Sequence, residues 1–336
     1  MKKAILTTIA LAVATASLSA NAGFMFRYPI SGVKAQGDSV VTPPVEDEPV
    51  NAWVTFALEH GLDNPEDQDF DYIDWSRNSL TELPTSLYPK NNPDMMYFGF
   101  NSISDISGLS SLSEVNTIDF MNNNVSSIEP LSNLIKASQI NFTNNNISDV
   151  SALSNLDSLN YFSFGSNKIT SLKALSKLTY VSHFYINNNK LTSLDGLENL
   201  TSSLDFDASN NAIQSISGIS NLNLPGMSLN LSNNQIASIK ALSNLTSVDS
   251  LNLSGNKLIS LDGLDNLIGV NTLNLNDNPN LIDISSLNNV NFARAINIDS
   301  DIADRAGFVS IDADSFICSS SMVIVMGASK EDICSN

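Results

Sequence analysis

Hydrophobic residues recur with a fixed period along most of the chain. Residues 118–123 read IDFMNN, and 22 residues later residues 140–145 read INFTNN. Ten copies align on one asparagine each, at Asn78, Asn101, Asn123, Asn145, Asn167, Asn189, Asn211, Asn234, Asn256 and Asn278. The spacing is 22 residues except for two steps of 23, and residues 296–298 supply an eleventh strand with Asp301 in place of the asparagine. Self-similarity of this length predicts a solenoid.

Each copy combines two hydrophobic spacings. Leu251 and Leu253 alternate with polar residues, which is typical of a strand, whereas the next leucines recur every three residues, at Leu258, Leu261, Leu264 and Leu267. Three-residue spacing favours short 3₁₀ turns. One copy cannot bury its apolar residues alone, but stacked copies can, with their strands joined in a parallel sheet at about 4.8 Å per step. The pattern therefore predicts an α/β solenoid with ten repeats and a partial eleventh strand over residues 70–303.

The repeated asparagine is expected to lie where the chain leaves the strand and bends inward. Its side-chain amide can both donate to and accept from backbone groups that the bend leaves without partners. A hydrophobic residue there would leave those groups unsatisfied. We therefore predict that Asn145→Leu or Asn189→Leu destabilises the protein far more than Asn144→Ala at the exposed neighbour.

The segments on either side of the repeats have the character of caps. Residues 48–69 predict a helical cap, because Pro49 stands near the start of an apolar pattern formed by Val50, Trp53, Ala57 and Leu58, and Gly61 ends it. Residues 304–336 lose the period. Their apolar residues are expected to close the far end of the core, namely Phe308, Ile311, Phe316 and the run from Met322 to Met326.

The first 47 residues have a different composition. Residues 1–22 predict a secretory signal peptide, with two lysines, an apolar stretch and a small-residue site ending at Ala22. Export to the periplasm or the extracellular space is expected. Residues 23–47 form an extended N-terminal segment and linker, whose aromatic part at 24–30 is compatible with either an added strand or a flexible N-terminus.

Charge and cysteine content narrow the possible functions. The formal net charge of −19 disfavours nucleic acid and anionic lipid as partners. No apolar run after the signal peptide is long enough to span a membrane. The two cysteines, Cys318 and Cys334, are expected to form a disulfide in an oxidising compartment, and this would add about 3 kcal/mol of stability.

The pattern LxLxxNxIxxIxxLxxL in 22-residue steps resembles the leucine-rich repeats of the bacterial internalin family, over about residues 70 to 300. The resemblance implies a curved, right-handed superhelix capped at its ends, with strands on the concave face and 3₁₀ turns on the convex face. In that family the concave sheet binds a host protein. This chain shows no clear immunoglobulin-like domain after the repeats and no wall-sorting motif, so a role in host-cell invasion is not implied.

Strand residues that alternate with the inward ones are the candidate binding residues. An aromatic stripe is expected in the N-terminal half, because exposed tyrosines supply rigid contact area with a polar group. The contact centre is predicted at Tyr97, Phe100, Tyr161 and Tyr185. The candidate partner-binding residues are Tyr72, Arg77, Tyr97, Phe100, Met121, Tyr161, His183, Tyr185, Asp205 and Asp207.

Catalysis and metal binding are weaker interpretations. The two histidines, His60 and His183, are too far apart in the predicted fold to form a pair, and no activated Ser or Cys accompanies His183. Asp205 and Asp207 supply fewer oxygens than calcium requires. We expect no enzyme activity, no cofactor and no metal.

Two functions remain open. The protein is either a secreted recognition module that binds a partner protein on its concave face, at a cell surface or on a host, or a glycan-binding envelope protein that uses the same tyrosines with Asn and Asp. Binding of a cationic protein should weaken as salt rises, whereas glycan binding should persist in salt and be competed by simple sugars. The oligomeric state is not predicted.

Overall fold

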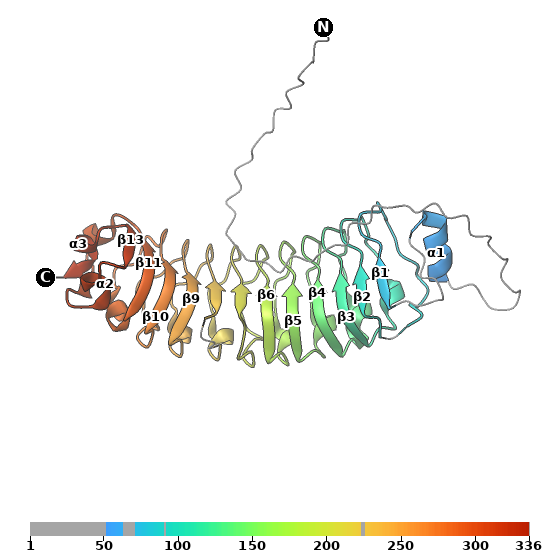
Figure 1. Ribbon diagram of the computed structural model, residues 1–336, viewed down its shortest axis with the longest axis horizontal. Coiled ribbons are helices and arrows are strands. Elements are labelled where there is room, and N and C mark those ends of the chain that lie inside the picture. The colour runs from blue at the N-terminus through green and yellow to red at the C-terminus, as the bar shows by residue number, and fades with distance from the viewer. Residues whose placement is uncertain (1–51, 63–70, 91, 223–225, 336) are drawn as a thin grey trace, which may run out of the picture. The chain divides into compact units, whose positions relative to one another are not determined.

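The computed structural model describes residues 52–62, 71–90, 92–222 and 226–335. From Tyr72 onward these residues coil into an open, curved solenoid, and each coil contributes a strand to a single sheet of 12 parallel strands (Figure 1). Strands follow one another in chain order, with β13 beside β11. They are β1 (Tyr72–Asp74), β2 (Met95–Tyr97), β3 (Glu114–Asp119), β4 (Lys136–Asn141), β5 (Ser158–Ser163), β6 (Tyr180–Tyr185), β7 (Asp205–Asp207), β8 (Ser228–Asn230), β9 (Ser247–Asn252), β10 (Gly269–Asn274), β11 (Phe292–Ile298) and β13 (Ile324–Gly327).

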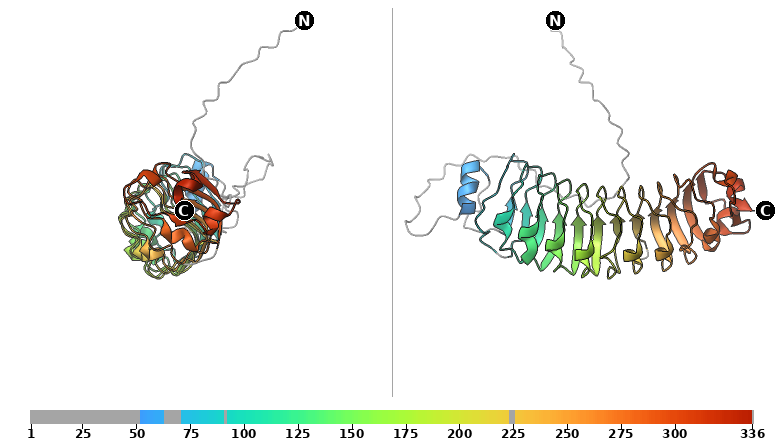
Figure 2. Two further views of the ribbon diagram at one scale, coloured as in Figure 1. Left: turned by 90° about the vertical axis from the view of Figure 1, so that its left-hand side faces the viewer. Right: turned by 180° about the vertical axis from the view of Figure 1, so that it is seen from behind.

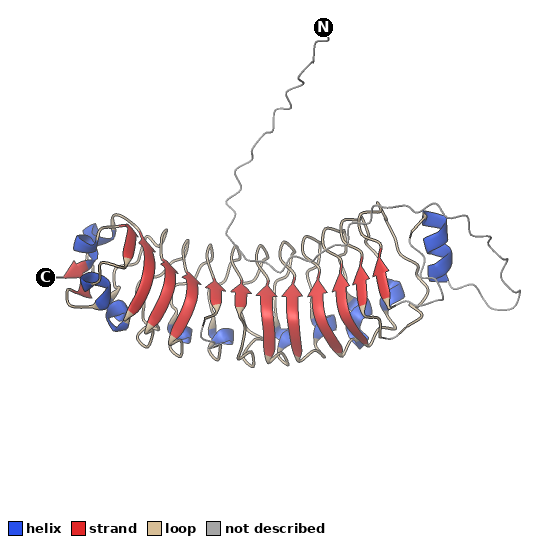
Figure 3. Ribbon diagram, in the orientation of Figure 1, coloured by secondary structure: helices blue, strands red, loops and turns tan. Residues whose placement is uncertain are grey.

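Short 3₁₀ helices occupy the return path of most coils (Figure 3). They form where leucine or isoleucine recurs every third residue, so that one side of each turn faces the core. Their bounds are η2 (Ser107–Leu109), η3 (Glu129–Asn133), η4 (Ser151–Leu153), η5 (Lys173–Leu175), η6 (Ser217–Ile219), η7 (Lys240–Leu242), η8 (Ser285–Asn289) and η9 (Ile302–Asp304). The predicted combination of parallel strands and 3₁₀ turns is confirmed.

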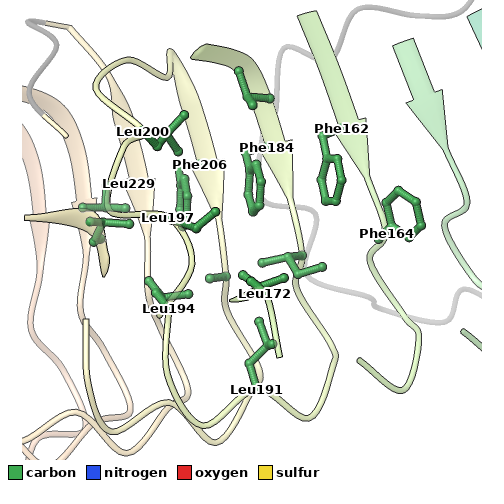
Figure 4. Close-up of a cluster of buried hydrophobic side chains, with 14 of the residues drawn as sticks. Phe162, Phe164, Leu172, Phe184, Leu191, Leu194, Leu197, Leu200, Phe206 and Leu229 are labelled. Atoms are coloured by element: carbon green, nitrogen blue, oxygen red, sulfur yellow. The ribbon is translucent and has the colours of Figure 1, made fainter. Parts of the chain in front are cut away.

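The core between sheet and turns is built from ladders of identical side chains. Phe162, Phe184 and Phe206 stack with ring centroids 4.7 and 4.9 Å apart, and leucines from the return path pack against them (Figure 4). A second phenylalanine ladder runs through the earlier coils and consists of Phe98, Phe120, Phe142 and Phe164. It meets the first ladder where Phe164 packs against Phe162. Each ring covers its neighbour, so no single coil has a complete core of its own.

The repeated asparagine satisfies backbone groups as predicted, and these groups belong to neighbouring coils. Asn145 accepts the backbone N–H of Val125 at 2.9 Å, and its Nδ2 donates to the carbonyls of Phe120 and Phe142 at 2.9 and 3.1 Å. The same set of bonds recurs at Asn123, Asn167, Asn189, Asn211, Asn234, Asn256 and Asn278. The first copy differs, because Asn78 is exposed and bonds locally.

A helix packs against the first coils. In α1 (Ala52–His60), Trp53 and Ala57 are fully buried, and the Trp53 ring stacks on Trp75 with centroids 5.8 Å apart. Gly61 adopts a φ of +62° directly after the helix, where glycine avoids the steric cost of other residues. The prediction that Leu58 faces the core is wrong, since its side chain is 63% exposed and Phe56 is buried instead.

Two short helices and a small sheet close the C-terminal end of the solenoid, which faces the viewer in the left panel of Figure 2. These are α2 (Phe316–Ser319), α3 (Lys330–Ile333), β12 (Ile311–Asp312) and β14 (Cys334–Ser335), and the predicted Cys318–Cys334 disulfide joins α2 to β14. Val323 is buried as predicted. The prediction that the whole run from Met322 to Met326 closes the core is wrong, because β13 extends the sheet and its side chains alternate, leaving Met322, Ile324 and Met326 exposed.

In the eleventh coil, an arginine side chain makes the bonds to backbone carbonyls that asparagine makes in the other coils. Asp301 was predicted to stand in the position of the asparagine, but its side chain is 68% exposed. A carboxylate has no N–H group to donate to the carbonyls of the bend. Arg305 makes those bonds instead, donating to the carbonyls of Asn278 and Leu281 at 2.8 and 3.0 Å. Its guanidinium also pairs with Asp299 and Asp301.

The predicted signal peptide, the segment 23–47 and the start of the N-terminal cap lie outside the described residues. Within the part of the chain that is described, no helix has both the length and the apolar character needed to cross a membrane.

Candidate binding surface

Outward side chains of the sheet form two parallel rows, which we call the sheet face. Strand register puts Tyr161, His183 and Asp205 side by side in the first row and Ser163, Tyr185 and Asp207 in the second. The remaining first-row residues are Tyr72, Met95, Thr117, Gln139, Ser228, Ser250, Thr272, Ala295 and Ile324. The second row continues through Asp74, Tyr97, Asp119, Asn141, Asn230, Asn252, Asn274, Asn297 and Met326.

Three aromatic rings meet in the middle of the sheet face. Tyr161 of β5 lies 5.5 Å from Tyr185 of β6 between ring centroids, with an interplanar angle of 62°. The His183 ring lies 6.2 Å from Tyr161 and 6.4 Å from Tyr185. All three side chains are partly exposed. We call Tyr161, His183 and Tyr185 the central cluster.

Two carboxylates border the central cluster on the next strand. The Tyr185 hydroxyl donates to Asp205 Oδ2 at 2.5 Å, and the backbone N–H of Ser209 donates to Asp207 at 2.8 Å. Burial and the adjacent Asp205 carboxylate raise the pKa of Tyr185 above its ordinary value. Burial likewise raises the pKa of Asp207, and repulsion from Asp205 adds to that increase. The strand β7 therefore carries two acidic groups that are held in place at the edge of the aromatic rings.

A second aromatic group lies at the N-terminal end of the sheet. Tyr72 and Tyr97 approach to 6.0 Å between ring centroids, and the Arg77 guanidinium lies 4.1 Å from the centroid of the Phe100 ring. Arg77 and Phe100 follow β1 and β2 in the left-handed conformation, each with a φ of 59°. Later coils place mostly Asn at the equivalent position, which tolerates that conformation better than Phe or Arg.

A buried polar network separates the two aromatic groups. Asp119 is fully buried, although it belongs to the second outward row of the sheet face. Its Oδ2 accepts from Asn141 Nδ2 at 3.0 Å, and its Oδ1 accepts from the backbone N–H of Met121 at 2.8 Å. Thr143 and Ser163 continue the network through a hydroxyl contact of 2.6 Å. These groups fix one another, so the surface between the aromatic groups is rigid and polar.

The four residues of the predicted contact centre do not lie together on the sheet. Tyr97 lies on β2, whereas Tyr161 and Tyr185 lie on β5 and β6, so β3 and β4 stand between them. Phe100 projects from a turn and not from a strand. Met121, two residues after the end of β3, is partly exposed and lies between the groups. The candidate residues therefore form two separate aromatic groups.

The sequence interpretation also overlooked exposed residues. Tyr180 at the start of β6 is 39% exposed, and its hydroxyl donates to Ser182 at 3.2 Å. Tyr180 was missed because β6 begins earlier in the chain than the alternating apolar residues of the repeat predict. Phe292, Ile324 and Met326 are exposed at the C-terminal end of the sheet, beyond the polar stretch of Ser, Thr and Asn.

Among the described residues, no group of three or more His, Cys, Asp or Glu side chains is arranged to hold a metal ion. His183 and His60 lie on different elements, β6 and α1. The groups that the middle of the sheet face exposes are therefore described by their rings and carboxylates, those of the central cluster and of β7.

Comparison with known proteins supports the repeat architecture. No protein-family model matches the chain, and no curated protein sequence matches it. Among solved structures, an internalin (InlF) from Listeria monocytogenes is 26% identical over 70% of each chain, with a TM-score of 0.52. The leucine-rich repeat domain of APL1B is 16% identical, with a TM-score of 0.51, and the match covers 83% of this chain and 93% of that domain.

The second match is evidence for the fold alone, whereas the first joins a similar fold to a similar sequence. Both matches agree with the repeat solenoid that the 22-residue period predicts and that the parallel sheet of this chain shows. The chain is an internalin-like leucine-rich repeat protein.

Proposed function

We propose that this protein recognises another protein on its sheet face, with the central cluster of Tyr161, His183 and Tyr185 as the contact centre. The observation that carries the proposal is the meeting of three partly exposed aromatic rings on neighbouring strands. Tyrosine is enriched at binding hot spots because it combines a large rigid ring with a hydroxyl group.

The surroundings of the cluster favour recognition over catalysis. Tyr185 is bonded to Asp205, and Asp207 is held by the backbone of Ser209, so the side chains are positioned before any partner arrives. Because these side chains are already ordered in the free protein, less conformational entropy is lost when a partner binds. The Tyr185 hydroxyl donates its only hydrogen to Asp205, so its oxygen is left to accept a hydrogen bond from a partner.

The test begins by capturing a partner from secreted, envelope and host fractions on the immobilised protein. The affinity of that partner is then measured for variants. Tyr161→Ala and Tyr185→Ala should each weaken binding at least tenfold, as the loss of about 2 kcal/mol at a hot spot implies. Tyr185→Phe separates loss of the ring from loss of the hydroxyl.

Ser250→Ala and Thr272→Ala on the same sheet face are the matched controls and should leave the affinity within about twofold. Equal melting temperatures for all variants would show that the fold is intact. Loss of affinity in the controls, with retention in the tyrosine variants, would place the site elsewhere. Displacement of the partner by simple sugars would favour the glycan-binding alternative.

A further inference from the structure

The charges of the protein are unequally divided around the solenoid. Strands β5 to β10 contain three acidic residues, Asp205, Asp207 and Asp249, and no Lys or Arg. The lysines of the same coils lie outside the strands, and all are exposed: Lys168, Lys173, Lys177, Lys190, Lys240 and Lys257. A surface with one sign of charge attracts partners of the opposite sign and repels others.

Aromatic rings and carboxylates adjoin one another at the centre of this surface. The register pairs His183 with Asp205 and Tyr185 with Asp207, so the acidic pair on β7 directly flanks the rings on β6. Tyr161 and Tyr185 meet at 62° and offer two surfaces of different orientation. Aromatic ring faces attract cations, and the attraction strengthens when water is excluded.

We propose that the partner inserts an Arg or Lys side chain against Tyr161 and Tyr185, with its charged end beside Asp205 and Asp207. This inference rests on the proposed function and specifies the partner as a basic protein surface. The alkyl part of an Arg or Lys side chain can pack against the tyrosine rings. Its guanidinium or ammonium group then donates hydrogen bonds to the carboxylate oxygens. A bare metal ion fits less well, because two carboxylates supply few ligands and the rings supply none.

A labelled octa-arginine peptide is the probe, with octa-glutamate as the comparison. Fluorescence anisotropy at 50 mM NaCl should show that the protein binds octa-arginine and does not bind octa-glutamate. Binding of octa-arginine should weaken at 300 mM NaCl because salt screens exposed charges. Asp205→Asn and Tyr161→Ala should each weaken octa-arginine binding at least fivefold, whereas Tyr161→Phe, which keeps the ring, should stay within about twofold of the unmodified protein.

Asp249→Asn is the matched control, because it removes the same charge from β9, two strands away from β7. It should change the affinity less than twofold. Equal weakening by Asp205→Asn and Asp249→Asn would mean that only diffuse attraction operates, and this would overturn the proposal. Failure of octa-arginine to bind would overturn it as well.

The captured partner distinguishes this inference from the proposed function. If Tyr161→Ala weakens the partner but not octa-arginine, the cationic contact is wrong and recognition on the sheet face stands. If Tyr161→Ala and Tyr185→Ala weaken neither ligand, both proposals fail.

Discussion

Each buried asparagine satisfies backbone groups on two coils with one side chain. Replacing Asn145 by Leu would leave the N–H of Val125 and the carbonyls of Phe120 and Phe142 without these partners. We expect Asn145→Leu to lower the free energy of unfolding by about 1 to 3 kcal/mol, because buried unsatisfied groups cost about that much. Urea denaturation of the variant and the unmodified protein measures the difference.

The neighbouring Asn144 requires a different control from the one the sequence suggested. It is exposed, but its φ of 57° lies in the left-handed region, where alanine is strained. Asn144→Ala is therefore not neutral, and Asn144→Gly is the appropriate control, expected within about 0.5 kcal/mol of the unmodified protein. Similar urea midpoints for Asn145→Leu and Asn144→Gly would contradict the role assigned to the buried asparagines.

Asp207 is expected to reduce stability at neutral pH. Burial raises its pKa in the folded protein above the unfolded value, so folding favours the protonated form. Stability associated with this group is present at low pH and is lost as pH rises through the folded pKa. Asp207→Asn, which keeps an oxygen for the Ser209 N–H, should raise the melting temperature at pH 7, and the gain should shrink towards pH 4. A gain that is larger at pH 4 would contradict this assignment.

At the scale of elements, Arg305 closes the last coil. Its side chain is 11% exposed, and its guanidinium bonds to two carbonyls and to Asp299. Burial alone would raise the pKa of Asp299, but hydrogen bonds from Arg305, Asp277 and Asn278 hold it below 3.8. We expect Arg305→Leu to cost about 3 kcal/mol at pH 7, since it leaves a partly buried carboxylate without its partner.

The cost of Arg305→Leu should diminish as the pH falls below 3.8, because the stabilising ionised form of Asp299 is lost there in any case. Arg294→Leu, at an exposed position on β11, is the control and should change stability by less than about 0.5 kcal/mol. Urea midpoints at pH 7 and pH 3 test both statements. A larger deficit at pH 3 than at pH 7 would contradict this account of the cap.

The repeating elements were predictable because each copy supplies the same evidence. Strands such as β9 follow from alternation at Leu251 and Leu253, and the 3₁₀ turns follow from leucines every three residues. Elements outside the period were not predictable in detail. The apolar run that becomes β13 has no polar residue in alternation, so its exposed side could not be assigned. The place of Arg305 depends on a contact 27 residues away, with Asn278.

At the scale of the molecule, the register of the sheet face could be derived from the sequence, but its solvent exposure could not. Tyr161 and His183 are 22 residues apart, as are Tyr185 and Asp207, and this spacing agrees with their pairing across neighbouring strands. Burial of Asp119 depends on side chains from neighbouring strands, and so does the hydrogen bond from Tyr185 to Asp205. Such contacts depend on side-chain conformations that a periodic pattern does not specify.

The two histidines allow the most direct test of where the partner binds. His183 belongs to the central cluster, whereas His60 lies on α1 at the end of the solenoid and is exposed. Diethyl pyrocarbonate labels accessible imidazoles, and mass spectrometry reports each site separately. With the captured partner bound, labelling of His183 should fall several-fold while labelling of His60 stays unchanged. Protection of His60 with unchanged labelling of His183 would contradict recognition on the sheet face.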